Sequence, residues 1–223
     1  MTRIAVCLSG CGVFDGSEIH EAVLTLLALD QAGAQVVCCA PNIPQSTVVN
    51  HMTRSPLAEA APRNVLIEAA RIARGNIVDL AQISASQIQA LILPGGFGAA
   101  TNLSTFATQG PECSVDPQVE RILMEMFHAR KPIGAICIAP ALVARVLGKH
   151  APGARLTIGT DKATAAAMER AGAHHCECNC DQILVDEQHL LVSTPAYMLG
   201  GGPAEVFEGV RKLVDRILLM AGR

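Results

Sequence analysis

One cysteine stands where a short apolar run gives way to a helical pattern. Residues 132–136 are typical of a buried strand and residues 138–147 of a helix, with Cys137 between them and small residues on either side. Such a strand–turn–helix junction is a nucleophile elbow, which presents its side chain above the carboxyl edge of a sheet. Because a helix N-terminus favours negative charge, we expect a reactive thiol with a lowered pKa. The alternative is a structural cysteine, which behaves as a small hydrophobe.

A glycine pair follows another expected strand, in the run Leu-Pro-Gly-Gly-Phe-Gly of residues 93–98. The backbone N–H groups of Gly95 and Gly96 can approach a ligand closely there, as in an oxyanion hole or an anion nest. The alternative is a tight turn, since a glycine pair by itself is weak evidence. The functional interpretation gains weight only beside Cys137.

Two carboxylates open the first expected helix, which begins at about Ser17 and ends at Gly33. Glu18 and Glu21 are three residues apart and share a face, and normally such residues form a solvated first turn favoured by the helix dipole. The apolar residues after Glu21 indicate that the helix turns inward there. A carboxyl buried beside a thiolate tends to be protonated, so Glu21 could donate a hydrogen bond to sulfur or carry a proton.

Further candidates need the tertiary structure for their interpretation. His20 neighbours Glu21, although consecutive helical residues point about 100° apart, and such a histidine is more often a surface or interface residue. Cys11, between two glycines after the first strand, could act as a resolving thiol if it lies near Cys137. Residues 174–180, His-His-Cys-Glu-Cys-Asn-Cys, offer soft metal ligands, yet no second C-x2-C pair accompanies them. We therefore expect an edge strand or a loop there, and assign no metal site.

The elements that must position these residues alternate along the chain, which predicts an α/β protein with a parallel sheet between helices. Strands are expected over residues 4–8, 35–40, 90–93 and 132–136, with weaker ones at 155–158, 182–185 and 189–192. Further helices are expected over residues 64–74, 118–129, 138–147 and 203–220. We interpret residues 1–223 as one domain with insertions near 41–62 and 104–117.

Composition limits the classes of function. The chain has 223 residues, 50% of them apolar, 17% charged and 3% aromatic, which excludes a disordered protein. A net charge of −3 gives no basic surface for nucleic acid or acidic membranes, and no apolar run is long enough to span a bilayer. Nine cysteines, an odd number with several inside apolar runs, indicate free thiols, and the start lacks a signal-peptide pattern. We expect a cytoplasmic protein whose aromatic-poor pocket suits a small polar carbonyl compound.

Three blocks of the sequence, residues 16–21, 93–98 and 135–140, resemble the PfpI/parkinsonism-associated deglycase superfamily, which is related to class I glutamine amidotransferases. Residues 10–21, 95–100 and 193–198 resemble more closely its enhancing-lycopene-biosynthesis branch, also called isoprenoid biosynthesis glyoxalase. The resemblance implies a flavodoxin-like three-layer sandwich, a homodimer, and a cofactor-free glyoxalase that converts glyoxal to glycolate. It also implies a disputed protein deglycase activity and a link to isoprenoid biosynthesis.

Position by position, the resemblance makes Cys137 the nucleophile and Glu21 the acid that hydrogen-bonds it. It assigns the oxyanion region to the backbone of Gly95, Gly96 and Ile138. The departure is a histidine, because residues 159–161 read Gly-Thr-Asp where many relatives carry one.

After residue 180, no histidine forms the His-x-Glu pattern that amidotransferases carry near the end of the chain, which argues against glutamine hydrolysis and against a Cys-His-acid triad. The alternative function is a redox-responsive or interaction protein in which Cys137 is oxidised instead of turning over substrate.

Overall fold

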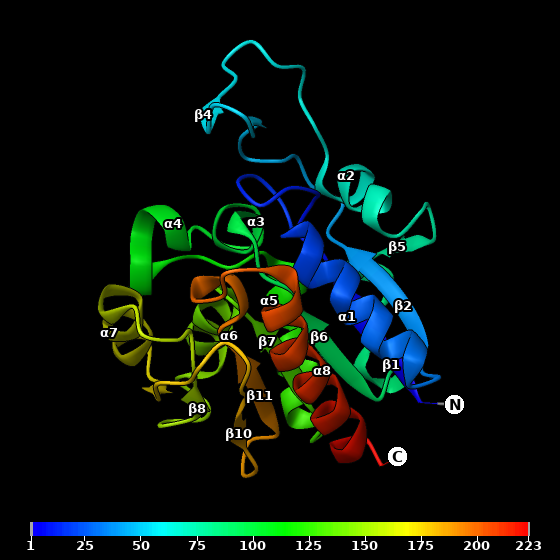
Figure 1. Cartoon of the computed structure of the whole chain (residues 1–223), viewed down its shortest axis with the longest axis vertical. Helices are drawn as coiled ribbons and strands as arrows, with labels where there is room; N and C mark the ends of the chain where they lie inside the picture. Colours follow the sequence, from blue (N-terminus) through cyan, green and yellow to red (C-terminus); the bar gives the residue numbers. More distant parts are fainter. Residues whose placement is uncertain (1, 223) are drawn as a thin grey trace.

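A seven-stranded sheet forms the centre of the computed structural model, which describes residues 2–222 (Figure 1). Its strand order is β10-β11-β7-β6-β1-β2-β5, and every neighbouring pair is parallel except β10 and β11. The strands are β1 (Arg3–Cys7), β2 (Gln35–Ala40), β5 (Ile77–Asp79), β6 (Ala90–Leu93), β7 (Ile133–Ile136), β10 (Leu184–Asp186) and β11 (Leu191–Thr194). Two small sheets pair β3 (Val49–Asn50) with β4 (Ser55–Pro56), and β8 (Arg155–Leu156) with β9 (His174–His175).

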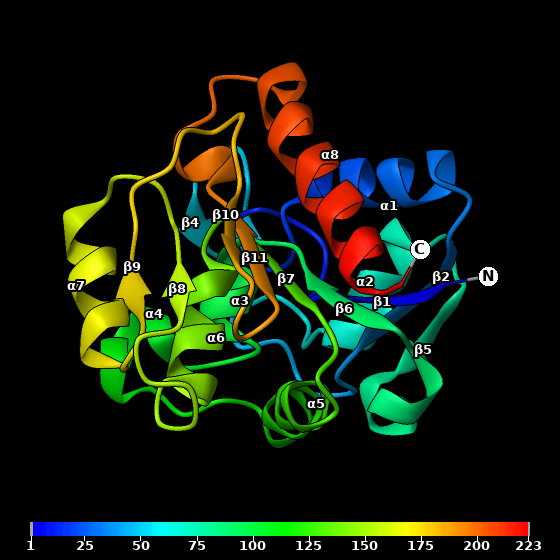
Figure 2. The same ribbon diagram turned by 90° about the horizontal axis from the view of Figure 1, so that it is seen from below.

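Helices cover both faces of the central sheet, as Figure 2 shows. They are α1 (Ile19–Gln31), α2 (Val65–Ile72), α3 (Phe97–Thr101), α4 (Phe106–Gln109), α5 (Pro117–His128), α6 (Ala139–Leu147), α7 (Lys162–Arg170) and α8 (Pro203–Met220). One core cluster joins the sheet to α1, α2 and α8, and the other joins it to α5, α6 and α7. The three-layer α/β fold is therefore confirmed.

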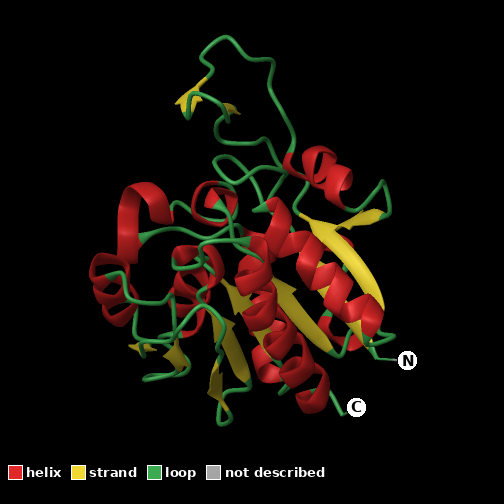
Figure 3. Ribbon diagram, in the orientation of Figure 1, coloured by secondary structure: helices red, strands yellow, loops and turns green. Residues whose placement is uncertain are grey.

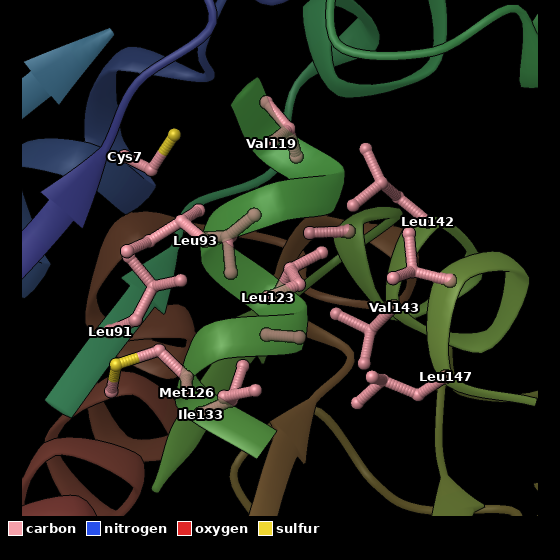
Figure 4. Packing of buried hydrophobic residues seen from close by; sticks show 14 of the residues in the cluster. Cys7, Leu91, Leu93, Val119, Leu123, Met126, Ile133, Leu142, Val143 and Leu147 are labelled. Atoms are coloured by element: carbon pink, nitrogen blue, oxygen red, sulfur yellow. The ribbon is translucent and has the colours of Figure 1, made fainter. Parts of the chain in front are cut away.

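The side chains that alternate along a strand explain these two cores, because successive residues point to opposite faces. In β1, Ile4 and Val6 pack on the α1 side, whereas Ala5 and Cys7 pack on the α5 side. Figure 4 shows the second side, where leucines of β6 meet the apolar residues of α5 and α6.

The start of α1 differs from the prediction. The helix begins at Ile19 with Glu18 as its N-cap, since the Glu18 carboxylate accepts the Glu21 N–H at 2.6 Å. The Ser17 hydroxyl instead accepts the Ser9 N–H at 2.8 Å, which ties the β1–α1 loop to the end of β1. Ser17 therefore binds the backbone of Ser9 and does not cap the helix, although serine is a preferred N-cap residue.

Short strands were the weakest part of the prediction. The edge strand β5 was missed because it has three residues and pairs only with β2. The strand expected over residues 155–158 is reduced to Arg155–Leu156, and it pairs with β9 outside the central sheet. Pairing partners, which the local sequence does not specify, decided both cases.

The two segments expected to be insertions lie beside the sheet's carboxyl edge. Residues 41–62 contain the β3–β4 hairpin, which projects from the body in Figure 1 and is mostly loop in Figure 3. Residues 104–117 contain α4 and close on themselves through a bridge between Ser104 and Val115. Across residues 2–222, no helix is both long and apolar enough to cross a membrane.

Candidate active site

The candidate site lies at one edge of the sheet, where four strands end. β1, β6, β7 and β11 are parallel neighbours, so their carboxyl ends meet at the same edge. The segments that follow them carry Glu21, in the first turn of α1, and then Gly95, Cys137 and Tyr197 respectively. The structure therefore brings together residues that are up to 176 positions apart in the sequence.

Cys137 occupies a strained elbow between β7 and α6. Its φ is 61°, a left-handed conformation that few residues other than glycine adopt. The Cys137 N–H donates to the Thr194 carbonyl at 2.9 Å, which holds the elbow against the end of β11. Such strain persists where the surrounding structure enforces it, and it clusters at functional sites. The elbow predicted from the sequence is thus present.

Glu21 is fully buried at the base of the site. Its two carboxyl oxygens accept backbone N–H groups, Oε2 from Gly95 at 2.9 Å and Oε1 from Tyr197 at 3.2 Å. The Glu21 side chain also hydrogen-bonds the Cys137 side chain. Burial and then the nearby Glu18 carboxylate raise the pKa of Glu21 to about 8, so this carboxyl is protonated at neutral pH.

The pKa of Cys137 is raised, and the sequence-based expectation of a lowered pKa was wrong. Cys137 is only 8% exposed, and burial followed by the adjacent Glu21 carboxyl disfavours the thiolate. The N–H groups of Gly96 and Ile138, which hydrogen-bond the sulfur, act in the opposite direction. The place of Cys137 at a helix N-terminus predicted a pKa shift of the wrong sign, because that argument left out the burial of the thiol.

The backbone N–H groups of Gly96 and Ile138 act as hydrogen-bond donors to Cys137, so they lie close to the atom that would bond a substrate carbon and are the candidate donors to the oxygen on that carbon. The N–H of Gly95, in contrast, is used by Glu21 and is not directed at the sulfur. Within the predicted oxyanion region, Gly95 therefore has a different task, which is to orient the acid. Its carbonyl also accepts the Glu18 N–H at 3.0 Å, so this residue clamps the start of α1.

Gly95 has no room for a side chain. A Cβ there would overlap Cβ of Cys137 and lie 2.6 Å from Glu21 Oε2. We expect Gly95→Ala to cost about 1–3 kcal/mol in the free energy of unfolding and to separate the acid from the thiol. Urea denaturation measures the cost, with Gly201→Ala as the matched control because its new Cβ would meet nothing closer than 3.7 Å. Equal stability of the two variants would contradict this close packing.

His20 lies at the rim of the site, outside the contacts of Cys137. Its Nδ1 is 2.7 Å from the hydroxyl of Tyr197, whose backbone N–H binds Glu21. Tyr197 was missed as a site residue, although it lies in the block 193–198 that carried the family resemblance. No pattern within that block marks its N–H as a partner of Glu21.

Cys11 lies near charged side chains of α2. The charged groups that act on its thiol are those of Arg71, Glu68, Asp15 and Arg63, and burial raises its pKa. All nine cysteines are free. The hypothesis that Cys11 is a resolving thiol for Cys137 therefore finds no support in their placement, because the charged groups that act most on Cys11 include Arg71 and Glu68 of α2, whereas Glu21 acts on Cys137.

The segment 174–180 forms the short β9 and a loop, without a cluster of ligands. Burial raises the pKa of Cys180 to about 11, whereas Cys176 and Cys178 are half-buried. In the part of the chain that the structure describes, no three His, Cys, Asp or Glu side chains gather closely enough to hold a metal ion.

A central parallel sheet with a cysteine on its strand–helix elbow defines an α/β protein of the class I glutamine amidotransferase-like type. The model of the DJ-1/PfpI family matches residues 11–197, and this chain belongs to that family.

The "ES1 protein homolog, mitochondrial" of Rattus norvegicus is 44% identical over 99% of this chain and 85% of its own length. The human "glutamine amidotransferase-like class 1 domain-containing protein 3, mitochondrial" is also 44% identical, over 99% of this chain and 84% of its own length. Among solved structures, an isoprenoid biosynthesis protein with an amidotransferase-like domain from Ehrlichia chaffeensis is 34% identical, with a TM-score of 0.92 over 99% of both chains.

Proposed function

We propose that this chain is a cofactor-independent glyoxalase that converts glyoxal to glycolate through a hemithioacetal on Cys137. The observation that carries the proposal is the direct pairing of the Cys137 thiol with a buried carboxyl, beneath two N–H groups aimed at the sulfur. A nucleophile, a proton carrier and an oxyanion site are the parts that addition to an aldehyde requires. Membership of the DJ-1/PfpI family is consistent with such an enzyme.

The chemistry balances with one substrate and one water. Sγ of Cys137 bonds to one aldehyde carbon, and the new oxygen takes the thiol proton while the N–H groups of Gly96 and Ile138 hold it. The Glu21 carboxylate removes the hydrogen of that carbon as a proton and returns a proton to the neighbouring carbon, while the hydroxyl proton on the first oxygen passes to the oxygen of the neighbouring carbon. The carbon on sulfur is thereby oxidised to a thioester and its neighbour is reduced to an alcohol. Water then cleaves the carbon–sulfur bond, which releases glycolate and restores the thiol.

The rate is expected to rise with pH between about pH 6.5 and 9. The raised pKa of Glu21, about 8, means that the carboxylate needed to remove the carbon-bound proton is scarce at pH 7 and abundant above pH 8. A pH profile of kcat/KM tests this, and its apparent pKa values belong to the Cys137–Glu21 pair together. A rate that peaks near pH 6 and falls above it would show that the protonated acid is the active form.

The same site could act on related carbonyl chemistry. We propose protein deglycation as a second reaction of this thiol, because the adducts formed by glyoxal on amines carry a comparable carbon centre. A link to isoprenoid biosynthesis is also a proposal, supported by the description of the Ehrlichia chaffeensis relative.

The homodimer and the cytoplasmic location likewise stay predictions. The rat and human relatives are both named mitochondrial.

A redox-responsive role for Cys137 is the second candidate. It is favoured by the hydrogen bonds of residues 2–222, in which the Glu21 carboxyl accepts from the backbone of Gly95 and Tyr197 and the neighbouring His20 binds the Tyr197 hydroxyl instead. Burial of the thiol and its raised pKa oppose rapid oxidation, because the thiolate is the form that oxidants attack. Intact mass after mild peroxide distinguishes the candidates, since a sensor would gain one or two oxygens on Cys137 in preference to the other thiols.

A further inference from the structure

A cavity lies between the β3–β4 hairpin, the β1–α1 loop and α3. Its volume is about 310 Å³, and its walls include Phe14, Phe97, Val49, Pro56 and Arg54. This volume is at the lower end of the range for small-molecule sites. None of these residues has a role in the chemistry proposed for Cys137.

The aromatic content of the cavity is high for this chain. The whole sequence contains five phenylalanines and one tyrosine, and two of the phenylalanines line this one space. Phe97 is 52% exposed although it follows directly on the buried Gly96 loop. Two aromatic rings with free surface provide an apolar binding wall for a ligand body.

Arg54 adds a single positive charge to this wall. Its guanidinium carbon lies 5.5 Å from the centroid of the Phe14 ring. None of the salt bridges found across residues 2–222 includes Arg54. The guanidinium therefore keeps its N–H donors for a ligand, at a surface where apolar groups weaken the competition from water.

The hairpin that carries Arg54 is anchored to the body of the protein. The buried carboxylate of Asp15 accepts the Val49 N–H at 2.8 Å, and Nε2 of His51 accepts the Phe14 N–H at 3.3 Å. At the hairpin's turn, Arg54 has a φ of 58° and donates its N–H to the Asn50 carbonyl at 2.7 Å. These contacts preform the cavity, which lowers the entropic cost of binding.

We propose that this cavity binds a small amphiphilic carboxylate. The carboxylate pairs with Arg54, and the apolar body lies against Phe14 and Phe97. One cation among the lining residues suits one negative charge, whereas a phosphate dianion is normally met by several donors of positive charge. The proposal concerns binding alone and does not depend on turnover at Cys137.

The test compares phenylbutyrate with its uncharged amide, phenylbutanamide, by calorimetric titration and by NMR of the Val49 methyl groups. We expect the carboxylate to bind about tenfold more tightly than the amide and to shift the Val49 resonances, because a hydrogen bond to a charged group is the stronger one. Arg54→Gln should abolish the difference between the two compounds. Phe97→Ala should weaken the binding of both.

Arg74→Gln is the matched control, since Arg74 is also exposed, also has a positive φ of 54°, and lines a separate cavity beside α2. It should leave both affinities unchanged, as should Cys137→Ala. Both arginines are on the surface, so thermal unfolding should show native stability for either variant. Equal affinity of Arg54→Gln and the unaltered protein for phenylbutyrate, or no binding that shifts Val49, would overturn the proposal.

Discussion

Cys137→Ala is expected to lower the rate of glycolate formation from glyoxal by on the order of a thousandfold or more. The variant loses the only atom in the proposed mechanism that bonds to substrate, and the remaining N–H groups and Glu21 can only bind or polarise the aldehyde. Glycolate formed over time, measured by chromatography, provides the test.

Two controls make this result specific to Cys137. Cys178→Ser removes a half-buried thiol from the loop after β9 and should leave the rate unchanged. Thermal unfolding of Cys137→Ala checks that the elbow survives, since alanine must adopt the same φ of 61°. Turnover that persists in a folded Cys137→Ala protein would eliminate the covalent mechanism.

Glu21→Gln should change both the activity and the pH dependence of stability. The two oxygens of Glu21 each accept a backbone N–H, so an amide must turn its own NH2 toward the N–H of Gly95 or Tyr197. A buried donor without an acceptor costs about 1–3 kcal/mol. The variant also loses the group that moves the proton between carbons, so we expect turnover to fall by on the order of a hundredfold or more.

The pH dependence follows from the raised pKa of Glu21. The folded protein holds this proton up to about pH 8, whereas the unfolded chain releases it near its ordinary value of 4.5. Between these values the folded state binds more protons, so the free energy of unfolding of the unaltered protein should fall as pH rises. The stabilising contribution is complete below pH 4.5 and is lost through pH 8.

Urea denaturation at several pH values measures this effect as the difference between two proteins, which cancels the other titrating groups. Glu21→Gln should show a smaller loss of stability, by a few kcal/mol, over the same range. Glu68→Gln is the control, because Glu68 is also buried but pairs with Arg63 and Arg71. Parallel curves for the unaltered protein and Glu21→Gln would show that Glu21 is ionised in the folded state at neutral pH.

Local sequence determined the parts of the site that depend on neighbouring residues. The elbow at Cys137 and the glycine turn at Gly95 could be predicted because each joins a buried strand to the next element within a few positions. The order of strands and helices likewise follows from short-range periodicity. The parallel pairing of β1, β6 and β7 then places both turns at one edge.

Only the tertiary structure decided what each of these groups does. The pKa of Cys137 is raised because the assembled layers desolvate it beside Glu21, although its position in the sequence suggested the reverse. Gly95 orients Glu21 because α1 meets the loop after β6, and Tyr197 joins them from the end of β11. The Cys11 thiol has charged side chains of α2, Arg71 and Glu68, among the groups that act on it. Burial and long-range hydrogen bonds depend on packing between distant segments, whereas the local sequence specifies only which elements are available to pack.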